Sequence, residues 1–247
     1  MELELLMMTS TISITIFLFS AVIAEIVGTI AGFGSATILV PIAGSLFDIK
    51  RAIGLVALFH FFGQLVDGFL WRKFIMWRIG ILFSVAGVIL AFVGASLIVY
   101  LPGRSIEIAL GVFLVTYAVY SLAGRKFVIP TTNAAIVVAG GITGFVAGLI
   151  GIPGALRTAF LSSLNLKREY FLGTSFAVAF LVDIVRVGVY FNSGTLELNP
   201  YWWMAIFVVA FFGSLIGKKL ITKIESAQFY LVVYCALLLF GIKLLFW

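Results

Sequence analysis

Residues 144–154 read GFVAGLIGIPG, and a related stretch, GTIAGFGS, occupies residues 28–35. Both stretches lie inside apolar sequence that is otherwise long enough to cross a bilayer. Each glycine lowers helix stability by about 1 kcal/mol relative to alanine, and a proline cannot continue a helix, so both stretches predict a broken helix. A helix break at membrane depth needs protein or a water-filled cavity around its freed backbone groups, which makes each break a candidate binding site.

The composition excludes a soluble domain. The 247 residues are 63% hydrophobic and 11% charged, which leaves too few polar side chains to cover a water-exposed surface. The net charge of +6 does not indicate a nucleic-acid partner, because the Lys and Arg residues cluster in short connections between apolar segments. A single cysteine, Cys235, gives no metal cluster, and no nucleotide-binding motif is present, so we expect neither a metal nor a cofactor.

Eight apolar segments organise the chain into two repeats, residues 1–126 and 127–247. Six segments have the length of a single membrane-spanning helix, and they cover residues 52–71, 79–101, 106–123, 170–191, 201–217 and 227–246. The other two, residues 11–47 and 134–164, contain the glycine stretches and are too long for one crossing but short for two complete ones. We therefore predict that each is a helical hairpin that turns at the glycines and leaves the bilayer on the side where it entered.

The distribution of basic residues supports the hairpin interpretation. If both long segments return to their starting side, one face receives ten residues: Arg72, Lys73, Arg78, Arg125, Lys126, Lys167, Arg168, Lys218, Lys219 and Lys223. The opposite face then receives four: Lys50, Arg51, Arg104 and Lys243. If each long segment crossed once, the same fourteen residues would divide eight to six. Because cytoplasmic connections are enriched in Lys and Arg, we expect both termini to lie outside the cytoplasm.

The two halves repeat with an offset of 116 to 117 residues, which aligns Gly28 with Gly144 and residues 50–51 with 167–168. Each half is then a hairpin followed by three crossings, and because three is odd the second half is inverted. The sequence thus predicts an all-α polytopic membrane protein built as an inverted repeat of broken, re-entrant hairpins, a plan that recurs in secondary transporters. Glycines four residues apart, such as Gly140 and Gly144, have a simpler alternative role, since they also allow helices to pack closely.

These residues also resemble a known family. The first glycine stretch with Val40-Pro41, the second with Gly151-Ile152-Pro153-Gly154, and the downstream Gly173-Thr174-Ser175 are similar to the sulfite exporter TauE/SafE family, also called the 4-toluene sulfonate uptake permease family. The resemblance covers nearly the whole chain. It implies transport of sulfite, sulfoacetate or related organosulfur anions across the cytoplasmic membrane of a prokaryote. The chain departs from the pattern at residues 151–153, where many relatives have three consecutive glycines.

Arg157 is the leading candidate for binding an anion. It follows the second glycine stretch and lies about 15 Å of helix from the basic end of its segment at Lys167, near the middle of the bilayer. A charge there costs at least about 2.5 kcal/mol, so it requires a counter-ion, a cavity or a substrate. The helix that begins after Pro153 also directs free N–H groups toward the break, which suits an oxyanion. The alternatives are a buried ion pair, for example with Glu25, and a side chain that reaches the interface.

Arg186 is a second arginine inside an apolar segment, and we expect it to be structural. Asp183 lies three residues before it on the same helix face and can neutralise it. The end of the segment at Phe191 is also close enough for the arginine side chain to reach the interface.

Four polar residues of the first half are candidates for proton coupling. His60, Gln64 and Asp67 are spaced at i, i+4 and i+7, so they share one helix face. A histidine can exchange a proton near neutral pH, and His60 is the only one in the chain. Glu25 is the only carboxylate inside the first long segment. The alternative for all four is interhelical hydrogen bonding that holds the bundle together.

The leading functional hypothesis is a secondary transporter, working as an exporter, for small sulfur-containing anions. Its site is expected between the two hairpin tips and comprises Gly32, Gly34, Ser35, Gly151, Gly154, Arg157, Thr174 and Ser175. An anion channel is the nearest alternative, because re-entrant hairpins also build pores. An enzyme is not expected, since no nucleophile–base or metal-ligand spacing is present. The expected partners are the anion and the lipid bilayer of the cell membrane, with a homo-oligomer open and no nucleic acid.

Overall fold

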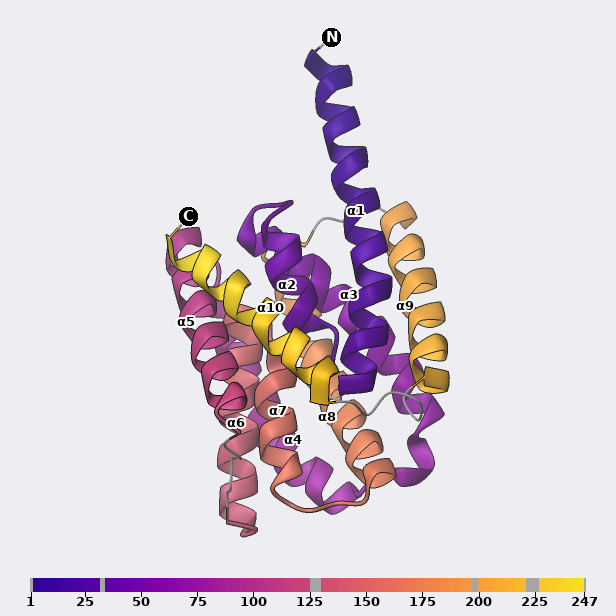
Figure 1. Cartoon of the computed structure of the whole chain (residues 1–247), viewed down its shortest axis with the longest axis vertical. Helices are drawn as coiled ribbons and strands as arrows, with labels where there is room; N and C mark the ends of the chain where they lie inside the picture. The colour runs from indigo at the N-terminus through magenta and orange to yellow at the C-terminus, as the bar shows by residue number, and fades with distance from the viewer. Residues whose placement is uncertain (1, 32–33, 125–129, 197–199, 221–226, 247) are drawn as a thin grey trace.

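The computed structural model describes residues 2–31, 34–124, 130–196, 200–220 and 227–246. All regular elements in these ranges are helices (Figure 1). In chain order they are α1 (Glu2–Ala31), α2 (Ala36–Gly44), α3 (Ile49–Leu70), the 3-10 helix η1 (Arg72–Phe74), α4 (Trp77–Leu97), α5 (Gly103–Leu122), α6 (Asn133–Ile150), α7 (Pro153–Ser162), α8 (Arg168–Asn192), α9 (Pro200–Leu220) and α10 (Ala227–Phe246). Seven described helices are apolar and long enough to cross a membrane, which confirms the all-helical, polytopic class.

The six predicted single spans correspond to α3, α4, α5, α8, α9 and α10, with ends that differ by up to four residues. Most of these helices extend into polar residues that hydropathy alone had placed in connections. Asp48, for example, caps α3 by accepting hydrogen bonds from the backbone N–H groups of Lys50 and Arg51, so the helix begins before the apolar segment. The first helix, α1, begins at Glu2, nine residues before the predicted start of its segment.

Both long segments are divided into two helices at the glycine stretches, as predicted. The first segment is broken between α1 and α2, and the second between α6 and α7. At the second break, Gly151 adopts a left-handed conformation with φ of 82° and ends α6, while Pro153 is the first residue of α7. These are the roles in which glycine and proline are most favourable at helix ends.

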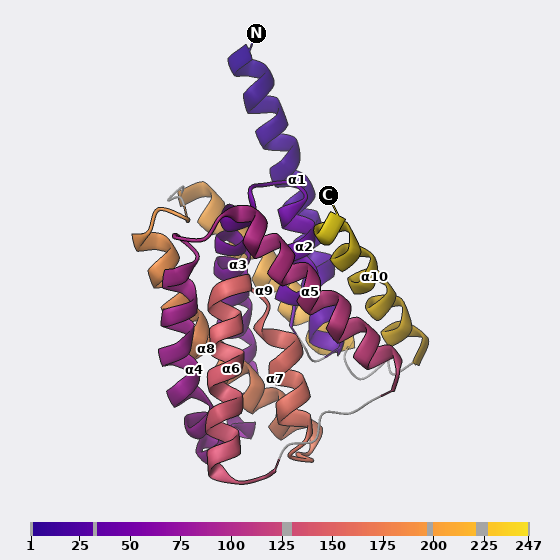
Figure 2. The same ribbon diagram turned by 90° about the vertical axis from the view of Figure 1, so that its left-hand side faces the viewer.

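The two broken pairs open toward opposite ends of the bundle. In Figures 1 and 2, α1 descends from the upper end and α2 returns upward, whereas α6 rises from the lower end and α7 returns downward. Where the first pair turns, the Gly34 N–H donates to the Gly28 carbonyl over 3.1 Å. A Cβ at Gly28 would lie 2.4 Å from the Gly34 carbonyl carbon, so the close return of the chain requires a glycine there.

Gly140, Gly144 and Gly148 lie inside α6, where they allow α4 to pack closely. This corrects the prediction that the second break begins at Gly144. A Cβ on Gly140, Gly144 or Gly148 would lie 1.9, 1.9 or 2.3 Å, respectively, from a backbone oxygen of α4. The axes of α4 and α6 therefore approach so closely that only hydrogen atoms fit between them. α6 continues past all three glycines to Ile150, and the break itself is confined to residues 151–152.

Candidate functional site

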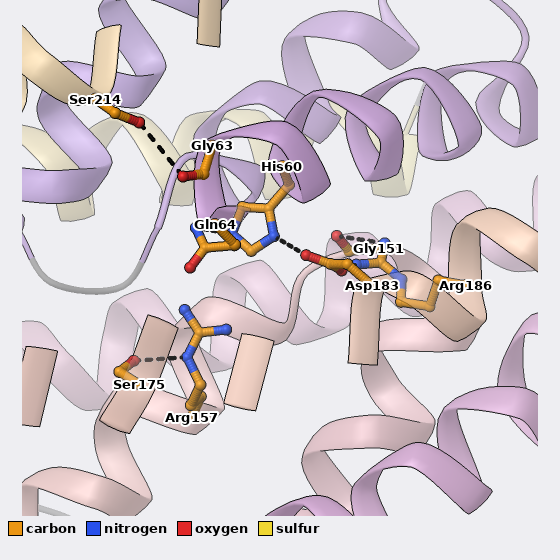
Figure 3. A network of polar contacts seen from close by, with 9 residues as sticks. All are labelled: His60, Gly63, Gln64, Gly151, Arg157, Ser175, Asp183, Arg186 and Ser214. Atoms are coloured by element: carbon orange, nitrogen blue, oxygen red, sulfur yellow. Dashed lines mark hydrogen bonds and ion pairs between the residues drawn. The ribbon is translucent and has the colours of Figure 1, made fainter. Parts of the chain in front are cut away.

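Arg157 lies in the first turns of α7, directly after the second break (Figure 3). Only 1% of its surface is exposed. Its Nε–H donates to Ser175 Oγ of α8 over 2.8 Å. Both terminal nitrogens of the guanidinium are buried and have no hydrogen-bond partner among the residues that the structure describes. Most of the donor capacity of this cation is therefore available to a ligand.

Gly34 brings the first break against this guanidinium. A Cβ built on Gly34 would lie 2.8 Å from His60 Nε2 and 3.4 Å from an Arg157 terminal nitrogen. The residue also has a φ of 79°, a conformation that L side chains rarely adopt. The backbone at Gly34 and the guanidinium of Arg157 thus lie next to each other. The sequence predicts this contact only indirectly, through the expectation that the two hairpin tips face each other.

A buried polar network lies beside Arg157 and ties α3 to α8. Asp183 Oδ2 contacts His60 Nδ1 at 2.5 Å, and Asp183 Oδ1 accepts from Arg186 at 2.6 Å. Gln64 Nε2 lies 3.2 Å from His60 Nε2. If the amide nitrogen donates, His60 Nε2 is the acceptor and its Nδ1–H donates to Asp183. A second Arg186 nitrogen donates to the Gly151 carbonyl at the second break over 3.3 Å.

The predicted pair of Asp183 and Arg186 is confirmed, but the idea that Arg186 reaches the interface is wrong, because its side chain is fully buried. Beside the two breaks, two guanidinium groups therefore lie near a single carboxylate, that of Asp183. Asp183 neutralises Arg186 directly, and Arg157 makes no ion pair among the described residues. The guanidinium of Arg157 is thus a buried positive charge without a direct ion pair in the described part of the chain, and such a group favours a bound anion.

The alternative pairing of Arg157 with Glu25 is not present. Glu25 lies instead against α3 and α9, where Ser214 Oγ donates to its Oε1 over 3.3 Å. The carboxylate is also within 3.2 Å of the position that a Cβ on Gly63 would occupy. Glu25 therefore belongs to a second polar cluster, separate from the guanidinium of Arg157.

The remaining predicted site residues fall into three groups. Ser35 and Gly154 are buried at the starts of α2 and α7, and the Ser35 hydroxyl has no hydrogen-bond partner among the described residues. Thr174 is buried on α8, but its Oγ1 accepts from the Met76 N–H over 2.9 Å and so serves the connection before α4. Gly32 lies outside the described residues.

Sequence reasoning missed two contributions. The contact between His60 and Asp183 joins residues 123 positions apart, and no local pattern links them. Ser214 of α9 is the second: it is a polar residue within an apolar segment, and such residues usually face a polar partner inside a bundle.

We expect Gly34→Ala to lower the free energy of unfolding by about 1–3 kcal/mol, because the methyl group is strained by the backbone conformation and crowds His60. Gly194→Ala is the matched control, since Gly194 has a φ of 73° but nothing within 4 Å of its added Cβ. Thermal unfolding in detergent compares the two. Equal losses from both substitutions would show that crowding at the break contributes nothing.

Long apolar helices define a polytopic membrane protein, and beside its two helix breaks the buried guanidinium of Arg157 has no ion-pair partner among the described residues. The sequence profile of the Sulfite exporter TauE/SafE family matches residues 17–244, nearly the whole chain. The chain belongs to this family. Comparisons with curated proteins and with solved structures gave no match.

Proposed function

We propose that this protein is a secondary transporter that exports small sulfur-containing anions such as sulfite, sulfoacetate and related organosulfonates. The observation that carries the proposal is the buried guanidinium of Arg157, whose terminal nitrogens are unpartnered within the described part of the chain and adjoin Gly34. Membership of the sulfite exporter family supports a sulfur oxyanion as the ligand.

The chemistry of the site suits a sulfite or sulfonate group. The fork of Arg157 can hold two oxygens of one oxyanion through parallel, charge-assisted hydrogen bonds. The N-terminal turn of α7 adds a partial positive charge, and Gly34 lets the anion approach the backbone closely. Ser35 offers a buried hydroxyl from the first half. In this arrangement Ser175 orients the guanidinium and contacts the anion only if the ligand displaces its bond to Nε.

Alternating access follows from the inverted repeat that the sequence predicts. In this proposal, α1–α2 and α6–α7 are re-entrant hairpins of two inverted halves, and the anion lies between their tips. Rocking of one half against the other would expose the tips first to one side of the membrane and then to the other. The opposite openings of the two broken pairs support this proposal (Figures 1 and 2).

We also propose that the protein resides in the cytoplasmic membrane of a prokaryote with both termini outside the cytoplasm. In Figure 1, α9 runs downward toward its basic end at Lys218 and Lys219, so this end of the bundle would face the cytoplasm. Arg125, Lys126 and Lys223 lie outside the described residues. The transporter proposal assigns no enzymatic activity to the chain.

Counterflow in proteoliposomes tests the proposal against the channel alternative. Vesicles loaded with unlabelled sulfite should transiently accumulate external labelled sulfite above its equilibrium level, because a carrier exchanges one anion for another. Arg157→Ala should abolish this overshoot, and acetate should not replace sulfite. Flux without an overshoot would identify a channel, and the absence of sulfite and sulfonate flux would refute transport of sulfur anions.

A further inference from the structure

Glu25 lies in a space that two other helices leave open for it. Its carboxylate Oε1 is 3.0 Å from the position of a Cβ on Gly63 of α3, and its own Cβ is 2.9 Å from that of Gly213 of α9. Ser214, the next residue of α9, donates to Oε1. Any larger residue at Gly63 or Gly213 would displace the Glu25 side chain, so the packing of three helices is arranged around one buried carboxyl group.

Asp67 brings a second carboxyl group to the same place. It is fully buried one turn after Gly63, and neither of its oxygens has a hydrogen-bond partner among the residues that the structure describes. It lies near Glu25 and Ser214, and the cation that faces it is Lys218 of α9. That ammonium group lies over the ring of Trp71, 5.3 Å from its centroid, and does not reach either carboxylate as an ion pair.

Comparison of the two repeats shows that Asp67 lacks a cation that its counterpart in the second half has. Asp67 and Asp183 are 116 residues apart, the same offset that aligns Gly28 with Gly144. In the second half, Asp183 is neutralised by Arg186, three residues later. The equivalent position in the first half is Leu70. Asp67 thus occupies the position of a paired aspartate without its arginine, and it faces Glu25 instead.

Two ionised carboxylates cannot remain together in this environment. Burial removes the water that would solvate them, and their mutual repulsion adds to that cost. The titratable groups that face Glu25 and Asp67 are each other, His60 of α3 and Lys218 of α9, and none of these forms an ion pair with them within the described residues. The pair therefore takes up a positive ion from solution, and the smallest is a proton bound by one of the two carboxyl groups.

We propose that Glu25, Asp67 and Ser214 form a proton site distinct from the Arg157 anion site, and that one proton bound and released there drives anion movement. The coupling part rests on the proposed transport function. The connection between the sites is the first break: Ser35 lies beside Glu25, and the preceding Gly34 adjoins both His60 and Arg157. A change of charge at Glu25 therefore acts on the segment that forms one wall of the anion site.

Infrared difference spectroscopy tests the proton site without any transported anion. The wild-type protein near neutral pH should show a protonated-carboxyl C=O stretch that shifts in D2O. The double variant Glu25→Gln, Asp67→Asn should lose this band, whereas Glu107→Gln, which changes a carboxylate on α5 paired with Arg104, should retain it. The assignment of a proton would be overturned if the wild type lacked the band, or if adding Na⁺ at constant pH abolished it because Na⁺ replaces the proton.

Proteoliposomes test the coupling, with sulfoacetate as the probe because sulfite itself binds a proton near neutral pH. A pH gradient should drive accumulation by the wild type, and Glu25→Gln should reduce this accumulation at least tenfold while sulfoacetate exchange persists. Accumulation by Glu25→Gln equal to the wild type, or loss of exchange together with coupling in a folded variant, would overturn the proposal. If the wild type moves no sulfur anion, the transport function fails, and the infrared result still decides the proton site.

Discussion

Replacing Arg157 with alanine should weaken the binding of sulfite and sulfoacetate by about 100-fold or more. Each hydrogen bond from a charged donor contributes about 1.5–3 kcal/mol, and a factor of 100 in affinity corresponds to about 2.7 kcal/mol, so the loss of two such bonds is sufficient. Titration calorimetry of the purified protein in detergent measures the change. Thermal unfolding of the same samples verifies that the variant is folded.

Two further variants separate geometry from charge. Arg157→Lys keeps the positive charge but loses the planar fork, and we expect it to recover only part of the affinity. Lys73→Ala removes a positive charge from an exposed position in η1 and should bind as the wild type does. An Arg157→Ala variant with wild-type affinity for both sulfur anions would contradict the assignment of the site.

The second large effect is expected on stability. Gly144→Ala should lower the free energy of unfolding by about 3 kcal/mol or more, because its methyl carbon would lie 1.9 Å from the Gly87 carbonyl oxygen. Real Cβ contacts are essentially never shorter than 3.0 Å, so α4 and α6 would have to move apart by about 1 Å along their closest line of contact. Thermal unfolding and the yield of monodisperse protein report the loss.

Gly188→Ala is the matched control for this prediction. Gly188 also lies inside a long helix, α8, but nothing lies within 4 Å of its added Cβ. Alanine is the better helix former, so this substitution should leave stability unchanged or raise it by up to about 1 kcal/mol. If Gly144→Ala were as stable as Gly188→Ala, the close α4–α6 contact would be refuted.

The parts of the fold that could be predicted are those with a local physical cause. Apolar length predicted the spans, and the left-handed Gly151 followed by Pro153 marks a break that any helix would show. Gly144 and Gly148 were harder to interpret, because a glycine lowers helix propensity wherever it stands. The close contact that each makes with α4 involves a residue 57 positions earlier in the chain, which no local rule identifies.

The candidate site divides in the same way. Arg157 and the pair of Asp183 with Arg186 could be recognised because mid-membrane charge is costly and a spacing of three places two residues together. The contact of His60 with Asp183 and the cluster of Glu25, Asp67 and Ser214 join separate helices. A single sequence predicts that such polar residues face the interior of the bundle, but it does not predict which of them contact one another.

A crystal structure of the protein soaked with selenite, a sulfite analogue that contains an anomalous scatterer, tests the central claim most directly. We predict an anomalous difference peak within about 4 Å of the terminal nitrogens of Arg157, beside Gly34, with the anion oxygens accepting hydrogen bonds from the guanidinium. An Arg157 side chain paired with a protein carboxylate, with selenite bound elsewhere or not at all, would contradict the account.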